Sequence, residues 1–231
     1  MSIPFSFDGI NHVCYDTRDG AWIPTCTQVM ELAGIAPSFK TMVKRGIILQ
    51  DTLDRRSWIG REVHDHTDTL DQDGEINPLW LCDDTRGYVQ SWEGFKQTTG
   101  FIPTEWSVRY CECIAGMPLS GELDCFGTFP GPRQTRIPAI VDKKTGASAS
   151  DSWAFQTCAY EMLRFASPKI GRLLRVVAHL KKDGSPGRAI QHAETSPIDG
   201  VNYADGFLAA LHCVHIGIRR GYISERDVID E

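Results

Sequence analysis

The sequence lacks the features that mark membrane, secreted and fibrous proteins. No apolar run approaches the roughly 18 residues that a membrane-spanning helix needs. The N-terminus has no basic stretch followed by an apolar one, which a secretion signal would show. The eight cysteines form no C-x-x-C pair, and we find no internal repeat or low-complexity tract. We therefore expect a soluble, cytoplasmic protein with no membrane partner and no disulfide framework.

Basic residues are also in short supply. The chain has 24 Lys and Arg against 30 Asp and Glu, which gives a net charge of -6. This balance argues against a protein that coats nucleic acid with its whole surface. Residues 162–191 are the exception, since they hold seven basic residues and one acidic residue. From this segment we select the following candidates for phosphate contacts: Arg164, Lys169, Arg172, Lys181 and Lys182.

The pattern of apolar residues predicts a mixture of helices and strands. Of the 231 residues, 42% are hydrophobic and 23% are charged, as in ordinary globular domains. We expect a hairpin over residues 12–23 and helices over residues 25–33, 57–70, 86–98, 151–165 and 202–217. Strands are expected over residues 104–113, 119–129, 136–144, 172–180 and 188–192. The predicted fold class is α/β (mixed, α+β-like), with one central mixed β-sheet flanked by helices.

We find no linker that would separate domains, and predict a single domain over residues 1–231. Within it we expect an N-terminal hairpin and helices (1–56), a core (57–192) and a C-terminal helix (193–231). Residues 71–78 are expected to form a polar loop between two helices.

One predicted strand ends in a pattern that suits metal-assisted hydrolysis. Asp142 and Lys144 lie two positions apart, so they share a face of the strand, and Lys143 points to the other face. Asp124 lies within the preceding predicted strand. Two carboxylates can hold a hard divalent cation, and a nearby ammonium can orient water or stabilise charge on a phosphate. Taken alone, the pattern of Asp142 and Lys144 could also belong to the end of a strand that simply faces solvent.

Further motifs flank this pattern in a fixed order. Gly60-Arg-Glu-Val-His64 lies upstream, where Gly60 is expected to let another segment approach closely. Gln156 and Tyr160 lie downstream at i and i+4 on one face of a predicted helix. The order G-x-x-x-H, G-x-x-D, D-x-K-T-G and Q-x-x-x-Y resembles the PD-(D/E)XK nuclease superfamily, in its RecB-like, lambda-exonuclease-like branch, including phage-type members. The resemblance covers residues 60–160, and Lys143 departs from it because apolar residues are usual there.

The resemblance implies a restriction-endonuclease-like core and a role for each matching residue. His64, Asp124, Asp142 and the backbone carbonyl of Lys143 would bind Mg²⁺ or Mn²⁺, and the imidazole would favour Mn²⁺. Lys144 would be the catalytic lysine, and Gln156 and Tyr160 would line the site. The implied protein is a phosphodiester hydrolase acting on DNA, which we expect to be an exonuclease in recombination or repair. It would work in a bacterium or a phage-infected host cell.

Several alternatives remain open on the sequence. The nuclease fold could serve as a non-catalytic DNA- or protein-binding adaptor, or the enzyme could act on RNA. His64 could be an ordinary surface histidine. Glu105 could reach the site or form a salt bridge with Arg109. A homo-oligomer or a recombination partner protein is compatible with this reading.

Overall fold

The computed structural model describes residues 3–9, 13–146, 148–197 and 199–228. The elements follow in chain order: β1 (Phe5–Asp8), β2 (Val13–Asp16), β3 (Trp22–Ile23), α1 (Cys26–Leu32), α2 (Phe39–Lys44), α3 (Gln50–Asp73), α4 (Arg86–Thr99), β4 (Ile102–Ile114), β5 (Met117–Pro130), β6 (Arg136–Lys144), α5 (Ser152–Phe165), β7 (Leu174–His179), β8 (Arg188–Gln191) and α6 (Tyr203–Arg219). Short 3₁₀ turns occur at Pro78–Trp80, Pro132–Gln134 and Glu225–Asp227. His12, expected in the first hairpin, lies outside the described residues.

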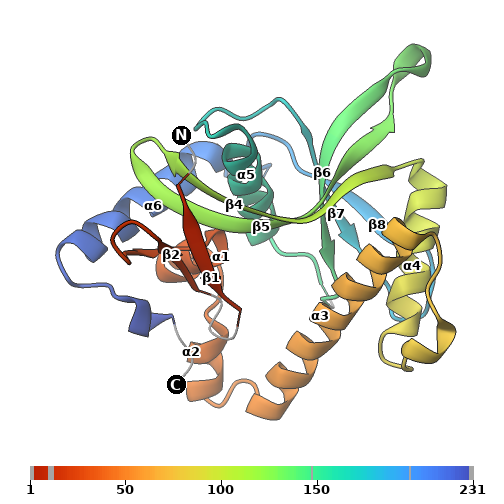
Figure 1. Cartoon of the computed structure of the whole chain (residues 1–231), viewed down its shortest axis with the longest axis horizontal. Coiled ribbons are helices and arrows are strands. Elements are labelled where there is room, and N and C mark those ends of the chain that lie inside the picture. The colour runs from red at the N-terminus through yellow and green to blue at the C-terminus, as the bar shows by residue number, and fades with distance from the viewer. Residues whose placement is uncertain (1–2, 10–12, 147, 198, 229–231) are drawn as a thin grey trace.

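A five-stranded mixed sheet forms the centre of the molecule, in the order β4-β5-β6-β7-β8 (Figure 1). Neighbouring strands are antiparallel except β6 and β7, which run parallel and are joined through α5. Two parallel strands need such a crossover, because the chain must return to the end of the sheet at which the first strand began. This confirms the expected mixed α/β class with a central sheet flanked by helices.

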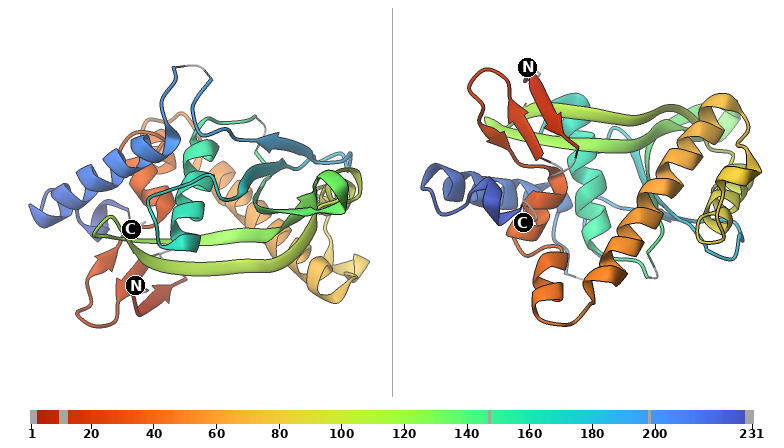
Figure 2. Two further views of the ribbon diagram at one scale, coloured as in Figure 1. Left: turned by 90° about the horizontal axis from the view of Figure 1, so that it is seen from above. Right: turned by 60° about the horizontal axis from the view of Figure 1, so that its bottom comes forward.

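Two hydrophobic clusters cover opposite faces of the sheet. Figure 2 shows α1, α5 and α6 grouped together, apart from α3 and α4. Helices α1, α5 and α6 pack around Ile140 on one face, and α3 and α4 pack around Val141 on the other. Successive side chains of β6 point to opposite faces, as Ile140 and Val141 do. Asp142 and Lys144 therefore lie on the face of α5, and Lys143 lies on the face of α3 and α4. The prediction that Lys143 points away from Asp142 and Lys144 is therefore confirmed.

A second, three-stranded antiparallel sheet, β1-β2-β3, stands beside the central one. The hairpin of β2 and β3 was expected, but β1 was not. Helix α1 begins after β3 with a capping box, in which the Thr25 hydroxyl accepts from the Gln28 amide and the Gln28 side chain accepts from the Thr25 amide.

Helix α3 is longer than predicted. It runs over Gln50–Asp73 and ends at Gly74 in the left-handed conformation, so the expected start at residue 57 was wrong. It also crosses the expected boundary between residues 56 and 57 and takes in the start of the expected loop. Its first turns are rich in exposed polar side chains, which gave no apolar stripe to detect. Within the described chain, no helix is both long and apolar enough to cross a membrane.

Candidate active site

The candidate site forms where β5 and β6 separate. Their ladder of paired residues ends at Cys125 and Val141, so the next residues no longer face each other across backbone hydrogen bonds. Here the Asp124 carboxylate replaces a backbone carbonyl as the acceptor, because its Oδ2 accepts a hydrogen bond from the Lys143 amide at 2.8 Å. The end of the ladder thereby places Asp124 beside the part of β6 that carries Asp142 and Lys144.

His64 reaches the same place from α3. Its Nε2 lies 3.1 Å from the Lys143 carbonyl oxygen, and its Nδ1 lies 3.5 Å from Asp124 Oδ1. Since a carbonyl oxygen only accepts, Nε2 carries the hydrogen and Nδ1 presents a lone pair when the ring is neutral. Burial, with Lys143 and Lys144 nearby, lowers the pKa of His64 to about 4, so the ring is neutral at pH 7.

Asp142 is fully buried on the central strand. Burial, with Asp124 close by, raises its pKa to about 6, although Lys144 acts against this shift. The Lys144 ammonium lies 2.8 Å from Asp142 Oδ2, but neither Asp142 oxygen accepts a hydrogen bond of good geometry from the described residues. A buried carboxylate with unused lone pairs is costly unless a cation satisfies it.

Lys144 stays protonated in this environment. Burial alone would lower the pKa of its ammonium, but Asp142 and Asp124 outweigh burial and raise it. About a quarter of its side chain is exposed (23%), so a bound molecule can contact it. Lys144 can therefore donate to water or to a phosphate oxygen.

Tyr160 and Gln156 lie behind the carboxylates on α5. Gln156 Nε2 donates to the Tyr160 hydroxyl oxygen at 2.6 Å. Burial, together with Asp142 and Asp124, raises the pKa of Tyr160 well above its usual value. Tyr160 therefore remains a neutral hydroxyl beside the two carboxylates, and Gln156 fixes its orientation.

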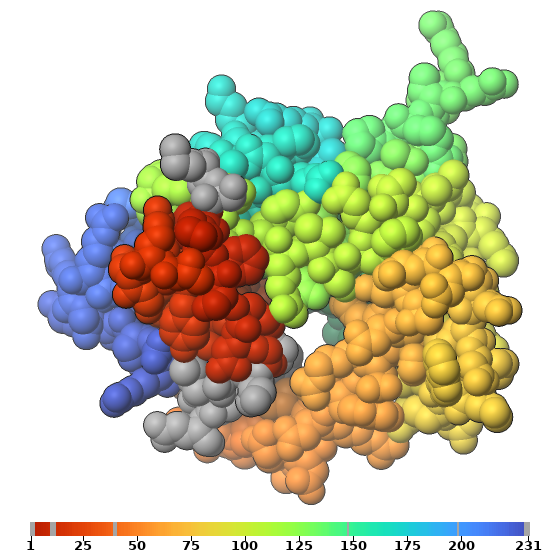
Figure 3. Space-filling model, viewed as in Figure 1, coloured from red at the N-terminus to blue at the C-terminus, as the bar shows by residue number. Residues whose placement is uncertain are grey.

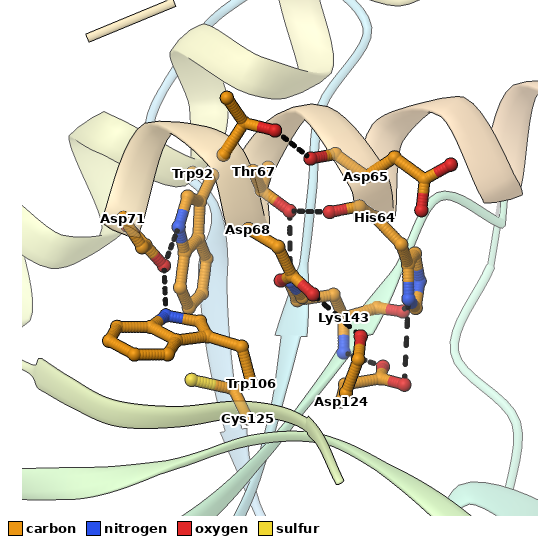
Figure 4. A network of polar contacts seen from close by, with 12 residues as sticks. His64, Asp65, Thr67, Asp68, Asp71, Trp92, Trp106, Asp124, Cys125 and Lys143 are labelled. Carbon is orange, nitrogen blue, oxygen red and sulfur yellow. Dashed lines mark hydrogen bonds and ion pairs between the residues drawn. The ribbon is translucent and has the colours of Figure 1, made fainter. Parts of the chain in front are cut away.

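Lys143 holds α3 against the sheet from the opposite face (Figure 4). Its buried ammonium donates to Thr67 Oγ1 at 2.8 Å and to Asp68 Oδ1 at 2.5 Å, and lies 5.4 Å from the centre of the Trp92 ring. Asp68 also accepts from the Ser107 hydroxyl. Behind it, Asp71 accepts from Trp92 and Trp106. Sequence reasoning noted Lys143 as unusual but gave its side chain no role.

The donor set of the site fits a divalent cation. His64 Nδ1 and Asp124 Oδ1 face each other with lone pairs, and the Asp142 oxygens lack hydrogen bonds from the described residues. Carboxylate and carbonyl oxygens suit Mg²⁺ or Mn²⁺, and the imidazole adds a preference for Mn²⁺. Among the described residues, no three His, Cys, Asp or Glu side chains are already drawn together as a metal cluster. Small side-chain rotations would therefore have to accompany metal binding.

One cavity reaches the site residues, and a second ends at the residues that follow Lys144 in the chain. The first, of about 580 Å³, lies among the N-terminal sheet, α1, β4 and β5, and reaches His64, Asp124 and Tyr160. Glu122, two residues before Asp124, lines it as well. The second, of about 870 Å³, runs along the first half of α3 to Thr145 and Gly146, directly after Lys144. Its basic lining residues are Arg55, Arg56, Lys181 and Lys182.

The five basic residues expected to contact phosphate do not lie on one surface. Lys181 and Lys182 line the second cavity, where Lys182 also pairs with Asp84 at 2.9 Å. Arg164 is held by Glu105 and Tyr110. Arg172 packs on the Phe165 ring, 4.8 Å from its centre, and Lys169 is exposed.

The expected salt bridge between Glu105 and Arg109 is wrong. Four residues along a strand span roughly 13 Å, too far for a direct pair. Glu105 pairs with Arg164 instead, and Arg109 pairs with Glu122, which faces it directly on β5. Gly60 also differs from expectation, since a Cβ there would meet no atom of another described segment within 4 Å.

No model of a known protein family matches the chain, and no curated protein matches it.

Proposed function

We propose that the protein is a metal-dependent DNA nuclease that hydrolyses phosphodiester bonds, and that it acts as an exonuclease in recombination or repair. One observation carries the proposal. Where the β5–β6 ladder ends, His64 of α3 lies 3.5 Å from Asp124 of β5, and Lys144 lies 2.8 Å from Asp142 of β6. Carboxylates from two strands beside a lysine form the kind of site that metal-assisted hydrolysis requires.

His64, Asp124, Asp142 and the carbonyl of Lys143 would hold the cation. Bound Mg²⁺ or Mn²⁺ supplies charge that polarises the phosphate and lowers the pKa of a bound water. The cation also compensates the two carboxylates, whose pKa values are both raised by burial.

Lys144 acts on the reacting atoms as an ammonium. Asp142 and Asp124 raise the pKa of this ammonium, which favours its protonated form. It donates a hydrogen bond that orients the water or stabilises negative charge on the phosphate. Tyr160, held neutral beside the carboxylates, offers a hydroxyl to the same region.

The second cavity supports a path for the DNA backbone. Arg55, Arg56, Lys181 and Lys182 line it, and it reaches Thr145 and Gly146, the residues that follow Lys144 in the chain. Phosphate contacts of this kind give affinity that does not depend on sequence and falls as salt rises. The net acidity of the chain restricts this attraction to local surfaces.

The proposal is tested with end-labelled linear, circular and single-stranded DNA, with Mn²⁺ or Mg²⁺ and then with EDTA. We expect cation-dependent release of short products from free ends. Lys144→Met should lower the rate at least about a hundredfold, the lower range for loss of one transition-state donor. Asp83→Asn, which changes an almost fully exposed carboxylate (98%), should retain full activity. DNA binding without cleavage would favour the adaptor, and cleavage of RNA alone an RNA nuclease; either result overturns the proposal.

A further inference from the structure

The first cavity has one wall that the hydrolytic site does not use. It opens between the N-terminal sheet, α3 and the strands β4 and β5, where Figure 3 shows the surface to be hollowed. Its inner end is formed by His64, Asp124 and Tyr160. Its outer wall carries Phe7 of β1 and Arg109 of β4. One cavity thus joins the proposed reacting centre to this outer wall.

Phe7 and Arg109 form a flat platform. The guanidinium carbon of Arg109 lies 3.7 Å from the centre of the Phe7 ring, which is a stacking distance. Glu122 fixes the guanidinium from the side, since Arg109 Nε donates to Glu122 Oε2 at 2.6 Å. The Arg109 side chain is 43% exposed, so the platform remains accessible. A guanidinium held in this way presents a planar surface before any ligand arrives.

The charge of the lining decides what this cavity accepts. Among the described residues, Arg109 is the only lysine or arginine that lines it, whereas Glu31, Glu122 and Asp124 are acidic. Apart from Asp124, which would bind the cation, the carboxylates of this lining accept hydrogen bonds from amino groups and give a phosphate no donor. The volume of about 580 Å³ falls within the usual range for a small-molecule pocket, roughly 300–1,000 Å³. A flat, uncharged ring with amino donors fits these properties, and a nucleobase is such a ring.

We propose that the first cavity binds the nucleobase next to the scissile phosphate, stacked on the platform of Arg109 and Phe7. This inference rests on the proposed nuclease function and adds the substrate class. A base inside a duplex is covered on both faces by its neighbours, so only an unpaired base can enter the cavity. The enzyme therefore acts on single strands or on frayed ends, and prefers them to an intact duplex.

The test uses substitutions that separate planarity from charge. Arg109→Lys keeps the charge but removes the plane, and Phe7→Leu removes the ring, whereas Phe7→Trp restores one. Trp80→Leu is the matched control, because Trp80 is an exposed aromatic residue that does not line the cavity. Circular dichroism melting checks that each variant folds.

Two readouts follow the base. The first is kcat/KM on single-stranded oligonucleotides, either complete or with one abasic nucleotide moved along the strand. Arg109→Lys and Phe7→Leu should each lower kcat/KM about tenfold, since one stacked base contributes roughly 1–3 kcal/mol. Phe7→Trp should recover most of the kcat/KM that Phe7→Leu loses, and Trp80→Leu should match the wild type. With the abasic nucleotide at the cleavage position, the wild type should fall to the level of Arg109→Lys.

The second readout is independent of hydrolysis. Quenching of 2-aminopurine in an oligonucleotide, measured with Ca²⁺ in place of Mn²⁺, should be strong for the wild type and weak for Arg109→Lys. If the wild type is active and Arg109→Lys shows the same rate and the same quenching, this inference is overturned and the nuclease function stands. Equal cleavage of intact duplex and single strands would have the same consequence. A wild type that is inactive on every DNA would overturn both proposals.

Discussion

The ammonium of Lys143 and the carboxylate of Asp68 form a buried ion pair, 2.5 Å long, that joins the central strand β6 to helix α3. The main chain of the same lysine contacts the candidate site, with its amide bonded to Asp124 and its carbonyl beside His64. Lys143 therefore connects the packing of α3 to the position of two proposed metal ligands.

Substitution of Lys143 should destabilise the fold. Lys143→Met leaves Asp68 as a buried charge without its partner, which typically costs about 3–5 kcal/mol in the free energy of unfolding. Urea unfolding measures the loss. Adding Asp68→Asn removes the unpaired charge while the amide oxygen still accepts from Ser107, so the double variant should recover a large part of the stability. A double variant as unstable as the sum of the two single variants would contradict this account.

Mn²⁺ should stabilise the folded protein through the candidate site. A cation present at 100 times its Kd adds about 2.7 kcal/mol to the free energy of unfolding, which corresponds to roughly 5–10 °C in Tm for a chain of this size. Asp142→Asn should lose most of this shift, because it replaces a buried carboxylate with a weaker ligand. Asp83→Asn should retain it, and EDTA should reverse it. The same shift in wild type and Asp142→Asn, measured by differential scanning fluorimetry, would place the cation elsewhere.

His215 should make stability depend on pH. Its Nε2 donates to the Pro118 carbonyl at 2.7 Å, and burial is the main cause that lowers its pKa. The unfolded chain, with a histidine pKa near 6.5, then binds more protons than the folded one at mildly acidic pH. The contribution of His215 is therefore complete above about pH 6.5 and is lost as the pH falls toward its lower folded pKa.

Urea unfolding at pH 7.5 and pH 5.5 compares the wild type with His215→Gln, which keeps an N–H donor but does not titrate. Between these pH values the variant should lose up to about 1 kcal/mol less stability than the wild type. Equal losses in the two proteins would mean that His215 titrates alike in the folded and unfolded chains.

Two helical glycines should respond to alanine in opposite directions. Gly60 on α3 has open space around it, so Gly60→Ala should stabilise the protein by about 0.5–1 kcal/mol through helix propensity. A Cβ at Gly87 on α4 would lie 1.8 Å from the Lys182 carbonyl oxygen, so Gly87→Ala should shift the backbone and destabilise the protein by about 1–3 kcal/mol. The midpoints of urea unfolding check both. A destabilising Gly60→Ala would show that Gly60 has a packing role after all.

The sequence predicted the elements whose pattern is local. Strand β6, predicted over residues 136–144, has these bounds in the structure, because its apolar run is bordered by turn residues. The alternation that placed Asp142 and Lys144 on one face is a property of any strand. The predicted length of helix α3 was too short. Its first half has no apolar stripe of its own and is stabilised because it continues a helix that packs on the sheet.

Contacts between distant segments were beyond such reasoning. The charge count for residues 162–191 could not reveal that Arg164 pairs with Glu105, or that Arg175 is buried against Glu161. The platform of Phe7 and Arg109 depends on how the N-terminal sheet lies against β4, which no local pattern encodes. His64 and Asp124 were predicted to share a site from the order of the motifs, and in the structure they lie 3.5 Å apart.

We propose that His64, Asp124 and Asp142 hold a cation that supports DNA hydrolysis with Lys144. The most direct test is the rate of product release from end-labelled single-stranded DNA as Mn²⁺ is titrated, for the wild type, Asp142→Asn and Asp83→Asn. We predict a saturable Mn²⁺ dependence for the wild type and Asp83→Asn. For a folded Asp142→Asn, we predict a rate lower by at least about a hundredfold. Undiminished cleavage by Asp142→Asn, or a wild-type rate unchanged by Mn²⁺ and EDTA, would show that these residues hold no catalytic cation.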